Sequence, residues 1–145
     1  DISKYFGSQN VLSEEFNFDR IIDNIIDFIQ KRSISRLIID PLSPLIFSVQ
    51  KHPNVARYIR QLVFRLEETG SYTTLMTSPI PVGSRLLSKN SVEEFISSGV
   101  IHLTCERQEN RHYQRYLTVK KMRGTAIDLN EHKFIIQADS GITLS

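Results

Sequence analysis

The order of predicted elements indicates an α/β protein in which a parallel sheet with helices on its faces is extended by antiparallel strands. Helical and strand patterns alternate in the first part of the chain, and extended segments follow one another around polar turns in the last part. The 145 residues, 40% hydrophobic and 23% charged, have the composition of a globular domain. We expect a single domain over residues 1–145, with an α/β part over 1–98 and antiparallel strands over 99–145.

Two amphipathic helices are expected in the α/β part. Asn17 is a candidate N-cap for the first helix, Pro53 suits the first turn of the second, and Gly70 ends it. In both segments apolar residues recur at helical spacing, which predicts one buried face. These residues are Ile21, Ile22, Ile25, Ile26 and Ile29 in the first helix and Val55, Ile59, Leu62, Val63 and Leu66 in the second.

Two strands are expected next to these helices. Residues 36–40 form an uninterrupted apolar run ending in an acid, which is typical of a parallel strand covered on both faces. Residues 72–77 form the second strand. The segment 78–90 is a long loop, and Ser91 with Glu94 predicts a capping box that opens a short helix.

The rest of the chain is predicted to form two antiparallel pairs of strands. Polar residues form the turn in each pair. The expected strands are 99–105 with 112–122, around a turn at 107–111, and 133–137 with 142–144, around a turn at 139–141.

The composition of the chain argues against several classes of protein. The net charge of +2 is too small to indicate nucleic-acid binding, and no apolar stretch is long enough to span a membrane. The single cysteine, Cys105, excludes an internal disulfide and is typical of a reducing cytosol, so we expect a cytoplasmic protein. The chain starts at Asp1 without an initiator Met, which we interpret as a sign of further residues upstream.

Polar residues follow both predicted parallel strands. Asp40 ends the first strand, at the edge where open α/β sheets bind ligands and where phosphoryl-transfer enzymes hold Mg²⁺. Thr77 and Ser78 end the second strand, where hydroxyls can bind a γ-phosphate or an attacking water. The alternative is that these residues only cap the turns that follow them.

The segment from Glu106 to Thr125 is basic, with six bases against two acids. Lys121 and Arg123 share one side of their predicted strand, and two cations one strand-step apart suit an anionic ligand. Gly124 allows a sharp turn directly after them. The alternative is a basic edge strand that prevents aggregation.

Residues 83–90 have the spacing of a phosphate-binding loop but not its residues. Ser88 stands where the second glycine belongs, and Asn90 stands where the Mg²⁺-binding Ser or Thr belongs. No helix is expected to begin at Lys89, so we reject this segment as a phosphate-binding loop.

Five segments in the same order resemble the KaiC family of RecA-type P-loop ATPases. They are RLIIDPLSPLI at 36–46, TLMTS at 74–78, SVEEFISSGVIHL at 91–103, LTVKKMRGT at 117–125 and FIIQADSGITL at 134–144. The first is similar to the Walker B strand of that family, and the fourth is its most specific match.

The resemblance implies a partial RecA-like core in which this chain supplies the Walker B strand, and a ring, usually a hexamer, with ATP at the subunit interfaces. Asp40 is then expected to act on Mg²⁺, directly or through water. Thr77 and Ser78 are expected to form the polar sensor at the end of the strand that follows the Walker B strand. Lys121, Arg123 and Gly124 are expected to reach the ATP of the neighbouring subunit, where an arginine supplied in trans can raise the rate by about three to five orders of magnitude.

The chain departs from the family pattern in ways that keep other functions open. Pro41 replaces a small residue after the Walker B Asp, and Pro79 stands where an acid often follows the TS pair. The Gly-rich Walker A loop is not among these residues, so we expect the chain alone to be inactive. The alternatives are a KaiC-like regulatory or assembly module that binds nucleotide without hydrolysing it, and a RecA-like DNA recombination factor.

Overall fold

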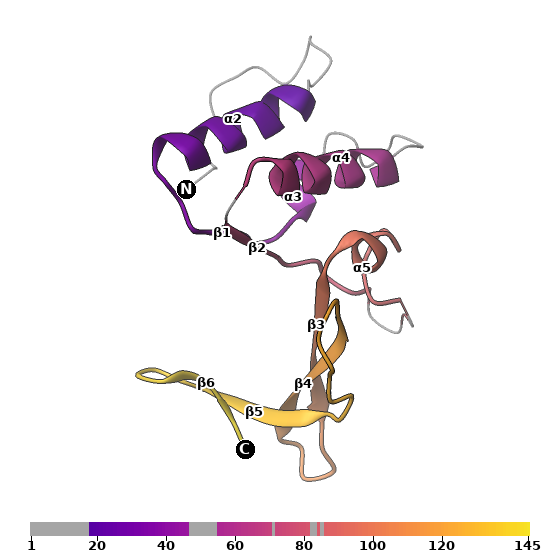
Figure 1. Cartoon of the computed structure of the whole chain (residues 1–145). Helices are drawn as coiled ribbons and strands as arrows, with labels where there is room; N and C mark the ends of the chain where they lie inside the picture. Colours follow the sequence, from indigo (N-terminus) through magenta and orange to yellow (C-terminus); the bar gives the residue numbers. More distant parts are fainter. Residues whose placement is uncertain (1–17, 47–54, 71, 82–83, 85) are drawn as a thin grey trace. The chain divides into compact units, whose positions relative to one another are not determined.

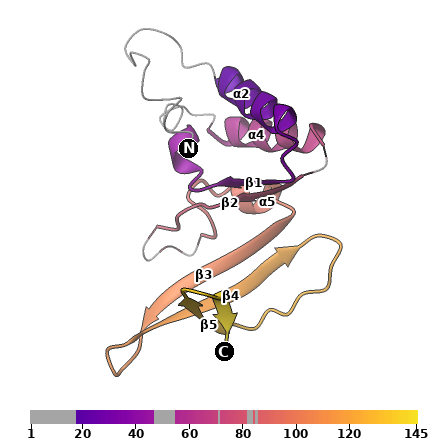
Figure 2. The same ribbon diagram turned by 90° about the vertical axis from the view of Figure 1, so that its left-hand side faces the viewer.

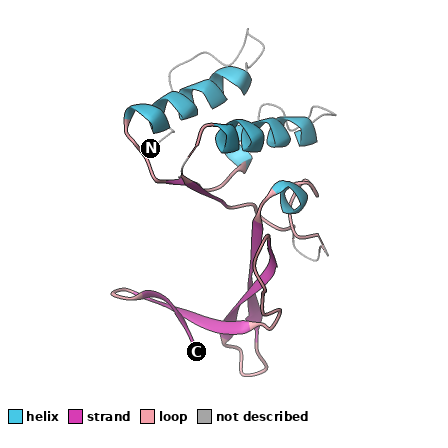
Figure 3. Ribbon diagram, viewed as in Figure 1, coloured by secondary structure: helices cyan, strands magenta, loops and turns pink. Residues whose placement is uncertain are grey.

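The computed structural model describes residues 18–46, 55–70, 72–81, 84 and 86–145 (Figure 1). These residues form two compact units, Asp1–Ser78 and Pro79–Ser145, which are described separately below. The first unit contains helices and a parallel strand pair, and the second contains mainly antiparallel strands (Figure 3). The predicted mixed α/β class is therefore confirmed. No helix in the described part is long and apolar enough to cross a membrane.

The first unit is built from two parallel strands with helices packed on one face. Strands β1 and β2 pair in parallel, with Ile38 opposite Leu75. Helices α2 and α4 lie side by side on the same face of these strands (Figures 1 and 2). The elements are α2 (Phe18–Lys31), β1 (Arg36–Ile39), α3 (Ser43–Ile46), α4 (Val55–Glu68) and β2 (Thr73–Met76).

Hydrophobic burial between the helices and the strands forms the core of this unit. Ile22 and Ile59 are fully buried, Leu62 and Ile46 are 1% exposed, and Leu42 is 2% exposed. Each such side chain contributes about 1.5–3 kcal/mol when it is removed from water. The apolar positions predicted for the two helices are buried as expected, except that Ile26 and Val55 are only half-buried.

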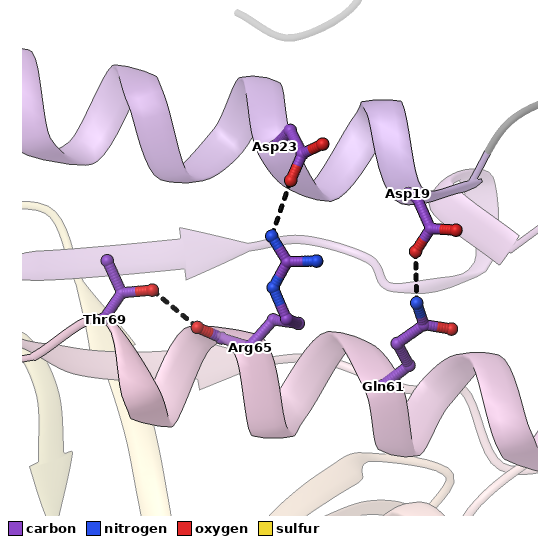
Figure 4. Close-up of polar contacts among 5 residues, drawn as sticks. All are labelled: Asp19, Asp23, Gln61, Arg65 and Thr69. Atoms are coloured by element: carbon purple, nitrogen blue, oxygen red, sulfur yellow. Dashed lines mark hydrogen bonds and ion pairs between the residues drawn. The ribbon is translucent and has the colours of Figure 1, made fainter.

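Polar contacts also join the two helices on the side away from the core (Figure 4). Arg65 Nη2 donates to Asp23 Oδ1 at 2.6 Å, and the Gln61 amide donates to Asp19. The Thr69 hydroxyl donates to the Arg65 carbonyl at 2.6 Å near the end of α4. Part of the acidic face of α2 therefore contacts α4 instead of facing only water.

The second unit is a four-stranded antiparallel sheet preceded by a one-turn helix. The strand order is β3-β4-β5-β6, so each strand pairs with the next one along the chain. The register between β3 and β4 shifts between Val100 and Ile101, which leaves Lys120 as an extra residue on β4. The elements are α5 (Glu93–Ile96), β3 (Gly99–Arg107), β4 (Tyr113–Met122), β5 (His132–Gln137) and β6 (Gly141–Leu144).

The structure corrects two sequence-based expectations. The predicted capping box does not form, because Ser91 has a positive φ of 55° and Val92, which makes no side-chain capping bond, is the N-cap of α5. Among the described residues β1 is covered on one face only, since Ile38 is 65% exposed. The short helix α3 was not expected. Asn17, the proposed N-cap of the first helix, and Pro53, expected in the first turn of the second, lie outside the described residues.

Candidate functional site

Asp40 and Thr77 are brought together because the strands that precede them are neighbours in the sheet. The Thr77 N–H donates to the Ile39 carbonyl at 3.0 Å, and the Leu42 N–H donates to the Thr77 carbonyl at 2.9 Å. These two bonds continue the strand pairing beyond its ends. The Thr77 hydroxyl then donates to Asp40 Oδ1 at 2.5 Å. The carboxylate therefore has a defined orientation at the carboxyl edge of the parallel strands.

The chemistry of this edge fits a hard divalent cation. Carboxylate and hydroxyl oxygens are ligands that Mg²⁺ prefers, and Mg²⁺ usually keeps several waters as well. Asp40 and Thr77 are both exposed, so water and a metal ion can reach them, and Ser78 next to them is half-buried. Asp40 is the residue at this edge that would hold Mg²⁺, which when bound supplies positive charge beside a phosphate.

Lys121 and Arg123 converge on the end of α5 in the second unit. Lys121 Nζ donates to the carbonyls of Glu94 at 2.9 Å and Phe95 at 3.1 Å. Arg123 Nη2 donates to the same Phe95 carbonyl at 3.1 Å. The two cationic groups thus lie on one side, as their spacing predicts, and they share the Phe95 carbonyl as an acceptor.

Main-chain contacts hold the end of β4 beside the end of α5. The Arg123 N–H donates to the Ser98 carbonyl at 2.8 Å, and Gly99 is opposite Met122 in the ladder. The bulge at Lys120 lies directly before Lys121, where such irregularities re-aim the side chains that follow. Gly124 has φ = 71°, in the left-handed region, which confirms the expected sharp turn.

A group of polar residues that the sequence did not identify fixes the start of α5. The Ser88 hydroxyl donates to the Glu94 carboxylate, and Ser88 is only 2% exposed. Asn90 Nδ2 donates to Glu93 Oε1 at 2.7 Å, and the Val92 N–H donates to Glu93 Oε2 at 3.2 Å. In the sequence Ser88 and Asn90 stand out only as residues that do not fit a phosphate-binding loop, and their spacing gives no signal of these contacts.

The pKa of Glu93 reflects this environment. Burial by itself raises the pKa of a carboxyl group, because it disfavours the charged form. Hydrogen bonds from the Glu93 main chain, Asn90 and the Val92 main chain stabilise the carboxylate and, together with the nearby Ser88 hydroxyl, outweigh burial. The pKa of Glu93 therefore lies below its ordinary value of 4.5, and the residue is charged at neutral pH.

The predicted site residues thus form two groups, one in each unit. Asp40, Thr77 and Ser78 follow the parallel strands of the first unit. In the second unit Lys121 lies near the end of β4, and Arg123 and Gly124 follow that strand. A shallow, largely apolar depression of about 290 Å³ lies on the β3–β6 sheet, and none of these six residues lines it.

Comparison with known proteins identifies the family. The sequence model of the KaiC ATPases matches residues 1–145, which is the whole chain. The chain belongs to the KaiC family of ATPases. The KaiC resemblance deduced from the five sequence segments is therefore confirmed.

A solved structure agrees with this assignment. The chain is similar to the KaiC-like protein PH0186 from the hyperthermophilic archaeon Pyrococcus horikoshii OT3, with a TM-score of 0.77 and 26% sequence identity. The similarity covers 100% of this chain and 66% of that KaiC-like protein. The search of curated proteins gave no match.

Proposed function

We propose that this chain supplies two parts of a shared ATP-hydrolysis site in a ring-forming KaiC-like ATPase. Asp40 is the Walker B carboxylate that acts on Mg²⁺ and water in its own subunit, with Thr77 and Ser78 at the polar sensor end. Lys121 and Arg123, followed by the turn at Gly124, act on the γ-phosphate of ATP bound to the neighbouring subunit.

The observation that carries this proposal is the contact between the ends of the two parallel strands. Asp40 and Thr77 follow adjacent strands of a KaiC-family sheet, and their side chains are hydrogen-bonded at 2.5 Å. A strand-ending acid alone occurs in many domains. An acid held by a hydroxyl from the next strand, at the edge of the sheet where ligands bind, supports a role for Asp40 toward a metal ion.

The cation pair supports the second half of the proposal. Lys121 and Arg123 donate to one carbonyl, so their positive charges are concentrated at one point of the surface. Convergent Lys and Arg donors suit phosphate oxygens, and Arg can form two parallel hydrogen bonds with them.

Mixing two inactive variants of the full-length protein tests whether the site is shared. Asp40→Asn and Arg123→Ala are each expected to lower ATP turnover, by about 10³-fold or more for Arg123→Ala, with nucleotide binding largely retained. If each site takes Asp40 from one subunit and Arg123 from the next, mixed rings contain some interfaces with both residues intact. The mixture is then expected to recover turnover.

The outcomes separate three arrangements. Recovery in the mixture supports sharing between subunits. Two inactive variants that stay inactive when mixed, in rings shown to exchange subunits, would place Asp40 and Arg123 in the same subunit's site. Full turnover by Arg123→Ala alone would remove the catalytic role, and ATP binding without turnover by the unmodified protein would favour a regulatory or assembly module.

A further inference from the structure

The cation pair depends on a helix that is too short to be stable by itself. Helix α5 contains four residues, and an isolated helix of this length is far below what is stable in water. Its last carbonyl groups have no partner further along the helix, and Lys or Arg side chains commonly satisfy such groups. Here Lys121 and Arg123 do so, through the carbonyls of Glu94 and Phe95.

The side chains that hold α5 come from the loop directly before it. Ser88 donates to Glu94, and Asn90 donates to Glu93 at 2.7 Å. Ser88 is buried, so its hydroxyl has little access to water and its bond to a carboxylate is charge-assisted. These bonds hold Glu93 and Glu94 in place, and the Glu94 carbonyl accepts from Lys121.

Two contacts complete the link to the strand that carries the cations. The Arg123 N–H donates to the Ser98 carbonyl at 2.8 Å, two residues after α5 ends. Gly99 then pairs with Met122 in the ladder between β3 and β4. Main-chain and side-chain hydrogen bonds therefore both join the end of α5 to the end of β4.

The contacts at the end of α5 have an electrostatic consequence besides satisfying its carbonyl groups. Lys121 and Arg123 both lie within hydrogen-bond distance of one oxygen, which brings two like charges together at a Coulombic cost. An anion that approaches both groups reduces this repulsion, so the arrangement suits an anionic ligand.

We propose that Ser88, Asn90, Glu93 and Glu94 form a positioning network, which orients Lys121 and Arg123 for phosphate through the carbonyls of α5. These four residues are positioning residues that do not touch the nucleotide. This inference rests on the proposed function, because it assigns them an effect on the ATP site that Lys121 and Arg123 complete.

The mixing experiment can show on which subunit the network acts. In the active interface of mixed rings, the Asp40→Asn chain supplies Lys121 and Arg123, and the Arg123→Ala chain supplies Asp40. Ser88→Ala added to the Asp40→Asn chain is expected to lower the recovered turnover about tenfold and to change the KM for ATP less than about twofold. The reason is that the reaction slows when catalytic groups are misplaced. The same Ser88→Ala substitution in the Arg123→Ala chain is expected to leave the recovered turnover unchanged, because that chain does not supply the cations of the active interface.

The contrast between the two chains distinguishes positioning from general destabilisation. Equal losses in both mixtures, or no loss in either, would overturn the proposal. The conservative Glu94→Gln keeps an oxygen that accepts from Ser88 and is expected to retain most turnover, whereas Glu94→Ala is expected to lose as much as Ser88→Ala. Equal activity of the Gln and Ala variants would also overturn it.

Amide hydrogen exchange provides a readout that does not depend on hydrolysis. In the unmixed full-length protein, Ser88→Ala is expected to speed exchange at residues 94–98 and 121–124, where the Arg123 amide reports the bond to Ser98. Ser140→Ala, which removes a hydroxyl that donates to Gln137 at 2.7 Å in the β5–β6 turn, is the matched control and is expected to leave these segments unchanged.

Exchange also separates failure of this inference from failure of the proposed function. If mixing fails to recover turnover but Ser88→Ala speeds exchange at 121–124, the shared ATP site is wrong and the link from Ser88 to the cations is supported. If Ser88→Ala leaves exchange at 121–124 unchanged, the network does not hold the cations, whatever the turnover.

Discussion

The two units of this chain hold their candidate site residues by different means. In the first unit Asp40 follows a strand that a hydrophobic core supports, and every buried apolar side chain of the described residues except Phe134 belongs to this unit. In the second unit the sheet leaves large apolar side chains exposed, and hydrogen bonds to carbonyls orient Lys121 and Arg123. Burial therefore sets stability in the first unit, and polar geometry sets side-chain orientation in the second.

The largest expected effect is the loss of a core side chain in the first unit. Ile59 is fully buried, so Ile59→Ala is expected to lower the free energy of unfolding by about 2–5 kcal/mol, through lost burial and the cavity left behind. Ile136 in the second unit is 60% exposed, so the same truncation there is expected to cost less than about 0.5 kcal/mol. Urea unfolding of both variants measures the difference, and equal losses would show that the two units do not differ in this way.

The turn after the cation pair is expected to show the next largest effect. Gly124 has φ = 71° and open space around its Cα, so Gly124→Ala is expected to cost about 1 kcal/mol through backbone strain alone. Gly99 has no positive φ, and an added Cβ would meet the flexible end of Met122. Gly99→Ala is the matched control and is expected to cost less, since the Met122 side chain can move aside. A larger loss for Gly99→Ala would contradict this account.

The surface ion pair between α2 and α4 is expected to contribute little to the free energy of unfolding. Arg65 and Asp23 are 2.6 Å apart, but their side chains are 38% and 59% exposed. Solvent screens such pairs, so a double-mutant cycle of Arg65→Met and Asp23→Asn is expected to give a coupling of about 0.2–1 kcal/mol. A coupling comparable to the loss in Ile59→Ala would mean that polar contacts, and not burial, dominate the first unit.

The smallest expected effect is a local response to acid in the second unit. The pKa of Glu93 is lowered in the folded state, so its contribution to stability is complete above its ordinary pKa of 4.5 and is lost as the pH falls below that value. Asn90→Ala removes one hydrogen bond to the carboxylate, and the titration midpoint of Glu93, followed by NMR, is expected to rise toward 4.5. A midpoint that stays unchanged would show that Asn90 does not stabilise the charged form.

Periodic patterns predicted the elements well, and local motifs predicted the contacts less well. The spacing of isoleucines predicted α2, and alternation with polar turns predicted the pairing of β3 with β4 and of β5 with β6. The capping box at Ser91 was wrong, because Glu93 and Glu94 accept from Asn90 and Ser88 instead. Such contacts depend on the path of the loop, which sequence spacing does not define.

The sequence by itself determined the family, the order of helices and strands, and the side that Lys121 and Arg123 share, because these follow from motif order and from the fixed period of a strand. Only the tertiary structure decided that the Thr77 hydroxyl donates to Asp40. This hydrogen bond depends on the register of two strands that lie more than thirty residues apart in the sequence. The tertiary structure alone also decided that Ser88 and Asn90 act on α5. A hydrogen bond needs two groups within about 3 Å, and only the folded chain sets that distance.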